Sequence, residues 1–506
     1  MTAGIELDTL EAKGLIRLAA VQPELEYLFR HALVQDAAYG SLLKQERRGL
    51  HARGGQALEE LYPDRRAELA AVLAMHFEQA GEVEKAIDYH VAAGNYALQR
   101  NALREAHDAF DHAATLLPPD DGDEALRRRR AEVRLGRVQA GYSFLPGPEL
   151  FDELDGLVPE VEAIGDQALA AKVHMLIALG RLQSGESPDE PLVKRSLDRM
   201  AEIGEATGDR SLRALPIALI GMRNVFSGSV RTGIRQLEEA LPLLDDRHDS
   251  IGAAFARGAL GVGYGTVGDF EKAEEAARHA KEIAAKGDLI AQLDALIMES
   301  MIRSSRGELD AAIPLAQECV TRSEETGASA CVMSSAWVLG DAFHRLGRFK
   351  EAREILKRGA DISAIVDRKV WRPTLQAWLA GTTVALGERE ADFEDALQTA
   401  RSIGNPIGEA GILSKRAEVA VSRQEWPAAL ADFEASAAIL EREGARPTLA
   451  RVLQAWGETL RAAGQTEAAE RILRRSLATF EELRLDREAQ VLKTELSVGG
   501  TPLSFG

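Results

Sequence analysis

Cysteine, aromatic residues and long apolar runs are all scarce in this chain of 506 residues. Its two cysteines, Cys319 and Cys331, cannot form a disulfide framework, and both fall on predicted helices, so we expect buried free thiols. No stretch of about eighteen apolar residues occurs, which argues against a membrane-spanning helix. The first residues contain no apolar signal core, so secretion is not expected and a reducing cytoplasm fits the composition.

Sequence signatures of catalysis are also missing. There is no G-x4-G-K-[ST] phosphate loop, no H-E-x-x-H zinc motif and no G-x-S-x-G elbow. The run from Gly263 to Gly268 matches G-x-G-x-x-G, but its glycines fall at the end of a predicted helix, where a dinucleotide is not expected. We therefore expect no enzyme activity, no catalytic residue, no cofactor and no metal site.

The charge of the chain limits its partners. Acidic residues outnumber basic ones by 80 to 61, which gives a formal net charge of −19. A surface with that excess of negative charge repels a phosphate backbone, so we do not expect nucleic acid to be a partner. No membrane association is expected either.

What the chain does contain is a repeat of about forty residues. Predicted turns recur at Gly228, Gly268, Gly307, Gly347, Gly387, Gln424 and Gly464. Glycine supplies the positive φ that ends one helix and lets the next fold back. Small residues such as Gly221 and Gly340 precede the turns at a fixed offset, and Gly233 and Ala352 follow them, so we expect two antiparallel helices to cross closely there.

These offsets resemble the tetratricopeptide repeat, whose pattern is W-x2-L-G-x2-Y, then A-x3-F, then P. The best matches are His90, Ala93, Gly94, Ala97, Ala106, Phe110, Ala113 and Pro118; Leu260, Gly261, Tyr264, Ala273, Ala277 and Ala280; and Leu339, Gly340, Phe343, Ala352 and Leu356. The resemblance covers roughly residues 66–496. It implies an all-α solenoid of about twenty helices in a right-handed superhelix, with the first helix of each hairpin on a concave face.

The first sixty or so residues follow a different pattern. Two short apolar runs, Leu15–Ala19 and Tyr27–Arg30, flank a segment that contains Pro23 and predict a β-hairpin. We expect a helix over about 32–43 and a second over about 46–61.

The segment Tyr27–Glu60 resembles the junction in bacterial STAND-type ATPases at which a winged-helix domain passes into helical repeats. The matching residues are Phe29, Arg30, His31, Ala32, Leu33, Gln35, Ala38, Tyr39, Arg47, Arg48 and His51. Many such proteins carry an adenylate or guanylate cyclase domain at their amino end, and a histidine of the winged helix senses the bound nucleotide. The matching position is His31. Without a phosphate loop we expect it to be idle, with its ring packed beside the hairpin.

We therefore predict three parts: a winged-helix remnant with a β-hairpin and linking helices over 1–62, a repeat array over 63–496 and a flexible tail over 497–506. The resemblance implies a non-catalytic sensor array of a cyclase-linked STAND-type signalling ATPase. Its partner would be a protein, a peptide or a small apolar ligand. The alternative is a free-standing interaction scaffold with no ATPase or cyclase output.

Candidate partner-binding residues follow from counting inward positions along the first helix of each hairpin. They are Leu215, Met222, Val225, Phe226, Ile297, Met301, Trp337, Asp341, His344 and Arg345. Leucine, methionine and aromatic side chains on a concave face would hold an apolar ligand or an amphipathic helix. The alternative is that these residues fill the packing between repeats. Trp371 and Trp378 fall in a degenerate repeat with Arg372 and Pro373, where a bend in the superhelix is expected.

Overall fold

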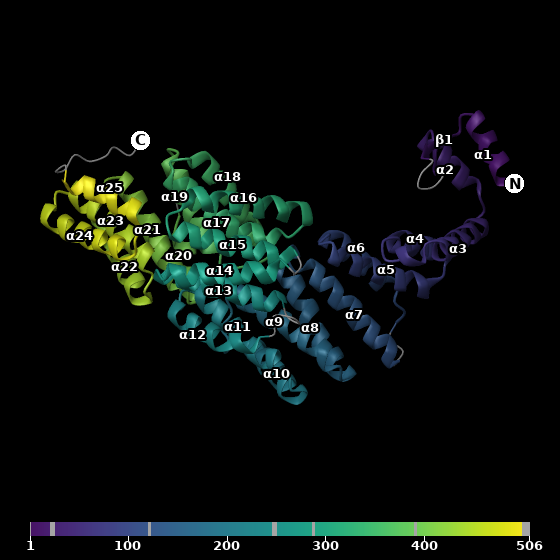
Figure 1. The fold of residues 1–506 in the computed structure, drawn as a ribbon, viewed down its shortest axis with the longest axis horizontal. Helices are drawn as coiled ribbons and strands as arrows, with labels where there is room; N and C mark the ends of the chain where they lie inside the picture. Colours follow the sequence, from purple (N-terminus) through teal and green to yellow (C-terminus); the bar gives the residue numbers. More distant parts are fainter. Residues whose placement is uncertain are drawn as a thin grey trace. The chain divides into compact units, whose positions relative to one another are not determined.

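Twenty-five α-helices and one small sheet make up the described part of the chain (Figure 1). The computed structural model describes residues 2–20, 26–119, 123–244, 250–285, 289–388 and 392–497. Two compact units are present: residues 1–96 with 108–119, and residues 97–107 with 120–506. Ser497 ends the last helix, and the rest of the predicted tail lies outside the described residues, as does Pro23.

The first unit starts with a β-hairpin between helices. Its elements are α1 (Thr2–Ala12), β1 (Ile16–Ala20), β2 (Glu26–Phe29), α2 (Ala32–Ser41) and α3 (Lys44–Leu61). The strands are antiparallel, with Ile16 opposite Phe29. These elements confirm the predicted hairpin and two helices. The predicted packing of His31 beside the hairpin is wrong, because His31 is the exposed N-cap of α2 and caps no backbone N–H with its side chain.

Helical packing continues from α3 into the first repeat. The following elements are a short 3-10 helix (Pro63–Arg65), α4 (Ala70–Ala80), α5 (Val83–Gln99) and α6 (Leu103–Leu116). Phe77 of α4 is fully buried, and Leu58 of α3 packs against the same cluster. A Cβ on Gly55 would lie 2.9 Å from Cζ of Phe77, so only glycine allows α3 to approach this closely. The boundary predicted at residue 62 therefore falls inside the first unit.

The second unit is a series of helical hairpins. Its helices are α7 (Glu124–Gly141), α8 (Gly147–Ile164), α9 (Gln167–Gln183), α10 (Pro191–Thr207), α11 (Arg210–Ser227), α12 (Val230–Ala240), a 3-10 helix (Leu241–Leu243), α13 (Ser250–Val267), α14 (Phe270–Ala284), α15 (Leu289–Ser305), α16 (Leu309–Thr326), α17 (Ser329–Arg345), α18 (Phe349–Ile365), α19 (Arg372–Ala385), α20 (Glu394–Ser402), α21 (Pro406–Ser422), α22 (Trp426–Glu443), α23 (Arg446–Ala462), α24 (Thr466–Glu482) and α25 (Asp486–Ser497). From α11 to α21 each odd-numbered helix packs against the next odd-numbered one, so these first helices form a continuous inner layer.

The backbone at the predicted turns has the expected conformation. The six glycines have φ between +72° and +99°, and Gln424 has φ of +59°. Within the hairpins, a Cβ on Gly340 would lie 2.3 Å from Cδ2 of the buried Leu356. A Cβ on Gly233 would lie 2.6 Å from the carbonyl oxygen of Gly221. The small residues therefore mark helix crossings, as predicted.

The hairpins of the second unit coil until distant segments touch. Arg223 of α11 donates from Nη2 to the carbonyl oxygen of Ile403 at 3.0 Å, across 180 residues. Arg451 of α23 donates from Nη2 to the carbonyl oxygen of Ser305 at 2.9 Å, across 146 residues. Helices α11 and α13 also pack against α21 and α23, respectively. The inner layer of first helices is therefore partly covered by another part of the same coil.

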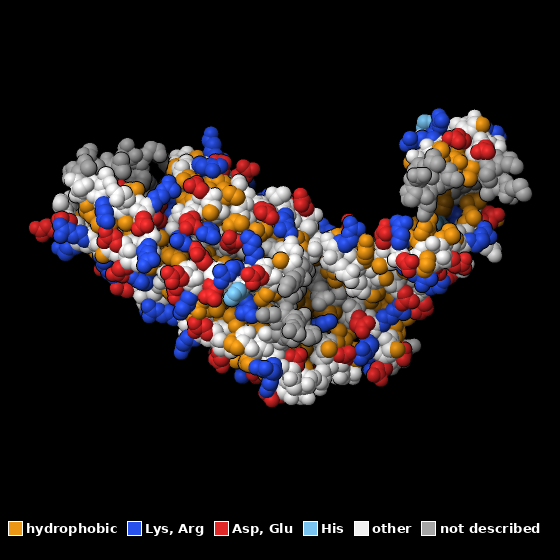
Figure 2. All heavy atoms as spheres, viewed as in Figure 1, with side chains coloured by type: hydrophobic (Ala, Val, Ile, Leu, Met, Phe, Trp, Pro, Cys, Tyr) orange, Lys and Arg blue, Asp and Glu red, His pale blue; other side chains and the backbone are white. Residues whose placement is uncertain are grey.

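The outer surface of the second unit is highly charged. Figure 2 shows acidic and basic side chains interspersed over its visible face. None of the described helices is both long and apolar enough to cross a membrane.

Cys319 and Cys331 are buried free thiols, which confirms the prediction from the sequence. Burial raises the pKa of Cys319 to about 11. That thiol is therefore protonated at neutral pH.

Candidate functional site

Five of the predicted partner-binding residues lie in the core of the second unit. Leu215, Met222, Val225, Ile297 and Met301 are each no more than 5% exposed. The expectation that they present an accessible apolar face is therefore wrong for this conformation. Their side chains fill the space between repeats, which was the alternative interpretation, because neighbouring first helices pack directly on one another.

Two other predicted residues, Phe226 and Trp337, belong to a group of rings on the inner layer. We call this group the aromatic cluster; its members are Phe226, Phe255, Trp337, Trp371 and Trp378. The ring centroids of Trp337 lie 6.2 Å from Trp371 and 6.4 Å from Trp378. Phe226 lies 5.8 Å from Trp371. These separations are typical of favourable aromatic pairs.

The two indole N–H groups of α17 and α19 differ in their partners. Trp378 donates from Nε1 to Oδ1 of Asp341 at 3.0 Å. Nε1 of Trp337 is buried and has no hydrogen-bond acceptor among the residues that the structure describes. A buried donor without an acceptor typically costs about 1–3 kcal/mol. Trp337 therefore carries an unused binding group inside the aromatic cluster.

Charged side chains lie directly beside these rings. We call them the inner polar cluster: Asp341, His344, Arg345, Lys415, Glu418, Arg451 and Glu488. Arg345 Nη1 lies 3.6 Å from Oδ2 of Asp341, and Arg451 Nη2 lies 2.8 Å from Oε1 of Glu488. Arg345 Nη2 also lies 3.8 Å from that Glu488 oxygen. The first helices α17, α21 and α23 and the last helix α25 are thus joined by ion pairs.

Burial and charge pairing set the protonation of this cluster. Burial raises the pKa of Asp341, but Arg345, Lys415 and the hydrogen bond from Trp378 outweigh it and leave the pKa below its usual value. Burial likewise opposes ionisation of Glu418, yet Lys415 and His344 bring its pKa to about 2. Burial lowers the pKa of Arg451. The two carboxylates are therefore ionised at neutral pH and are compensated by neighbouring cations.

His344 of α17 contacts side chains of both α19 and α21. Its Nδ1 lies 3.1 Å from Oγ1 of Thr382, and its Nε2 lies 3.4 Å from Oε2 of Glu418. Lys415 Nζ lies 2.8 Å from the same Glu418 oxygen and 5.2 Å from the ring centroid of Trp378. The predicted residues Asp341, His344 and Arg345 thus lie together beside the aromatic cluster. Lys415, Glu418, Arg451 and Glu488 were missed because they come from later repeats.

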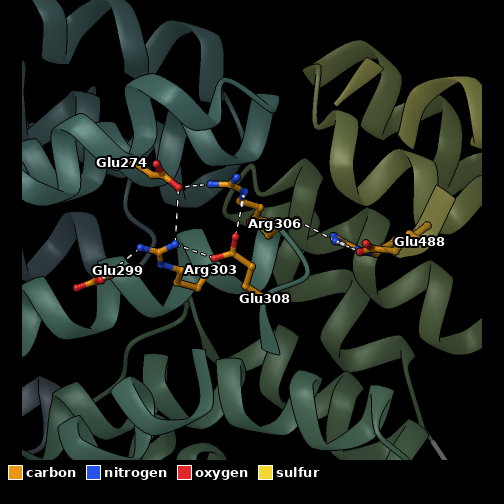
Figure 3. Close-up of polar contacts among 8 residues, drawn as sticks. Glu274, Glu299, Arg303, Arg306, Glu308 and Glu488 are labelled. Carbon is orange, nitrogen blue, oxygen red and sulfur yellow. Dashed lines mark hydrogen bonds and ion pairs between the residues drawn. The ribbon is translucent and has the colours of Figure 1, made fainter. Parts of the chain in front are cut away.

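A second set of ion pairs continues along the coil (Figure 3). Arg303 Nη1 lies 2.7 Å from Oε2 of Glu308, and both Arg303 and Arg306 contact Glu274 of α14. Figure 3 shows Glu488 of α25 in the same region as Arg306. The charged side chains here are thus paired with one another.

The motif at Gly263–Gly268 does not form a nucleotide site. Gly263 and Gly265 lie within α13, and Gly268 is the turn after it. A Cβ on Gly263 would lie 2.9 Å from Cγ1 of Ile234, so this glycine serves close helix packing. No strand precedes it among the described residues of the second unit, as the dinucleotide fingerprint requires.

One set of possible metal ligands was missed from the sequence. Among the described residues, the structure brings together Glu78, His90 and His112 of the first unit, although no metal site was expected. Glu78 and His90 lie twelve positions apart on opposite sides of the turn at Gly81, which is the spacing that could have indicated their contact.

Comparisons with known proteins identify the type of repeat. Residues 408–482 match the family model described as tetratricopeptide repeat. The uncharacterized protein R02095 of Rhizobium meliloti (strain 1021) is 33% identical over 152 residues, which is 29% of this chain and 15% of that protein. The chain therefore spans a small part of that relative's length.

Several solved structures are similar in arrangement. A Rap protein complexed with competence and sporulation factor is 14% identical over 70% of this chain and 98% of that one, with a TM-score of 0.49. The APC/C hetero-tetramer Cut9–Hcn1 is 11% identical over 93% and 94%, with a TM-score of 0.48. A STAND protein with a tetratricopeptide repeat sensor from Pyrococcus horikoshii is 16% identical over 92% and 60%, with a TM-score of 0.34. At these TM-scores none of them bears on function.

The helical hairpins, their turns and the matching repeats define an all-α solenoid of the tetratricopeptide type. Repeat arrays of this class present extended surfaces to protein or peptide partners. In this chain the aromatic cluster and the inner polar cluster lie on the inner layer of the second unit.

Proposed function

We propose that the chain is a regulatory array that binds a peptide segment of a protein partner at the aromatic cluster and the inner polar cluster. The observation that carries this proposal is the buried, unused N–H of Trp337, whose ring lies beside those of Trp371 and Trp378. A peptide carbonyl oxygen is a suitable acceptor for that group. The neighbouring ion pairs can exchange with charged groups of the same peptide.

Binding at this place requires the coil to open. Contacts such as those from Arg223 to Ile403 and from Arg451 to Ser305 now join its distant segments. A peptide that binds the opened form more tightly shifts the population toward it. Recognition would in this way be converted into a change in the shape of the array, which is what a sensor needs.

Selection of peptides from a random phage-displayed library on the full chain tests this binding function. We expect selected peptides to lose at least tenfold in affinity for Trp337→Phe, because phenylalanine keeps a ring but removes the N–H. Trp456→Phe is the matched control, since Nε1 of Trp456 is also buried without an acceptor but lies outside the aromatic cluster. Equal binding to wild type and Trp337→Phe would contradict the proposal.

We further propose that this array is the sensor region of a cyclase-linked STAND-type signalling ATPase in the cytoplasm, held with its output inactive until the partner binds. The support is the resemblance over Tyr27–Glu60, together with the order of β1, β2, α2 and α3 in that segment. The sequence of the gene upstream of Met1 tests it. A phosphate loop and a cyclase in frame would support the sensor, and an unrelated gene would favour the free-standing scaffold.

A further inference from the structure

Three potential metal ligands from three consecutive helices meet in the first unit. Glu78 lies in the last turn of α4, His90 in the middle of α5 and His112 in the second half of α6. One ligand atom from each lies within 4.8 Å of the other two. His90 is 9% exposed, Glu78 is partly buried and His112 is exposed. The group is thus anchored inside the first repeat and open on one side.

The three ligand atoms lie close enough to share an ion once the side chains rearrange. Nε2 of His90 already lies 2.9 Å from Oε2 of Glu78. The rings of His90 and His112 stack with centroids 5.2 Å apart and an interplanar angle of 8°, so one ring must turn out of the stack before both nitrogens can face a common ion. Tetrahedral Zn2+ with bonds of about 2.0–2.1 Å keeps its ligand atoms about 3.3–3.4 Å apart. Ligand atoms that now lie within 4.8 Å of one another must approach by up to about 1.4 Å to reach that spacing, and the exposed His112 can do so by changing its side-chain torsions.

The donor set decides which cation fits. Two imidazoles and one carboxylate, with a water in the fourth position, form a known type of open zinc site. Ca2+ and Mg2+ favour sites made entirely of oxygen ligands, which these helices do not provide at this place. Two neutral imidazoles and one carboxylate also carry a single negative charge, which partly neutralises a divalent ion.

We propose that Glu78, His90 and His112 bind Zn2+ and so tie α4, α5 and α6 together. By itself, the contact between Glu78 and His90 would be an ordinary ion pair between neighbouring helices. The convergence of His112 from the next helix is what distinguishes a three-ligand site from an isolated ion pair.

Zinc uptake by the full chain, measured by competition with a chromophoric chelator, tests the site. We expect one Zn2+ per chain and at least tenfold weaker binding in both His112→Ala and Glu78→Gln. Neither residue is buried, and glutamine at position 78 can still hydrogen-bond to His90, so both variants should fold. His279→Ala removes another exposed helical histidine and should bind as the wild type does.

Two further readouts separate this site from a surface ion. Co2+ should produce the intense visible absorption of a tetrahedral complex in wild type and lose it in His112→Ala. Zn2+ should also increase hydrogen-exchange protection across residues 70–116 of the wild type only. Absence of stoichiometric uptake, or uptake that is unchanged in both ligand variants, would overturn the proposal.

Discussion

Nε1 of Trp378 donates a hydrogen bond to Oδ1 of Asp341 at 3.0 Å and thereby links α19 to α17. Trp378→Phe should cost about 1.5–3 kcal/mol, because a hydrogen bond to a charged, partly buried carboxylate is lost. Hydrogen exchange should show weaker protection in α17 and α19 before the other helices. Trp371→Phe changes a neighbouring ring and leaves this hydrogen bond in place, so it is the matched control. Equal effects of the two variants would contradict the assigned role of the bond.

Gly340→Val should overpack the crossing of α17 and α18. The added Cβ would lie 2.3 Å from Cδ2 of Leu356, which is fully buried and has little room to move. We expect a cost of about 1–3 kcal/mol and a loss of hydrogen-exchange protection near residues 330–360. Gly381→Ala is the control, since its Cβ would lie an ordinary 3.5 Å from Cδ of Lys415. Unchanged protection in Gly340→Val would mean that this crossing can relax.

Gln424→Gly should stabilise the hairpin of α21 and α22. Gln424 has φ of +59°, a conformation that costs a residue with a Cβ about 1 kcal/mol. Denaturant unfolding followed by local hydrogen exchange should show a gain of up to about 1 kcal/mol. Gly464→Gln is the reverse experiment at the corresponding turn. It should destabilise the protein by a similar amount, which comes from the positive φ alone. No clash adds to it, because nothing lies within 4 Å of the added Cβ. The free energy of unfolding should therefore rise in Gln424→Gly and fall in Gly464→Gln, and a change in the same direction in both variants would contradict the assigned role of φ.

Acid should loosen the packing of α3 on α4. Burial, and then the positive charge of His51, lower the pKa of His76, and the Nδ1 atoms of these two residues lie 3.1 Å apart. The unfolded state therefore binds this proton more tightly than the folded state, so stability is lost as pH falls below about 6.5. Hydrogen exchange at pH 7.5 and 5.5 measures the loss. His76→Gln should reduce it, whereas His31→Gln, at an exposed position, should not.

ATP should not bind this chain with useful affinity. The sequence has no phosphate loop, and His31 is the exposed N-cap of α2. Calorimetric titration with ATP or ADP and Mg2+ should show no micromolar binding. A micromolar dissociation constant would contradict this expectation, and its loss in His31→Ala would assign the binding to this histidine.

Local features of this fold could be read from the sequence, whereas contacts between distant repeats could not. The glycines at 228 and 340 were predicted because a positive φ and a close crossing each demand a particular residue type. For Met222 and Met301 the sequence left burial and exposure open as alternatives, because the choice depends on how far each repeat rotates relative to the last. Small rotations accumulate over the array and decide whether the coil leaves its inner layer open.

In the candidate sites, too, residues of one helix could be predicted, whereas residues from distant repeats could not. Trp337, Asp341 and Arg345 were predicted because they recur near the inward positions of one helix. Arg451 and Glu488 complete the inner polar cluster from more than a hundred positions away, and no local pattern connects them with Asp341. His112 likewise joins Glu78 and His90 only after the chain has folded through another helix.

The hydrogen bond from Arg223 to Ile403 has a consequence for how the chain is made. At synthesis rates of roughly 5–20 residues per second, the 180 residues between them take roughly 9–36 s to follow. Until then α11 has left the ribosome without the later repeats that pack against it. During that interval the inner layer at α11 lacks the cover that α21 later provides, so a chaperone can reach it.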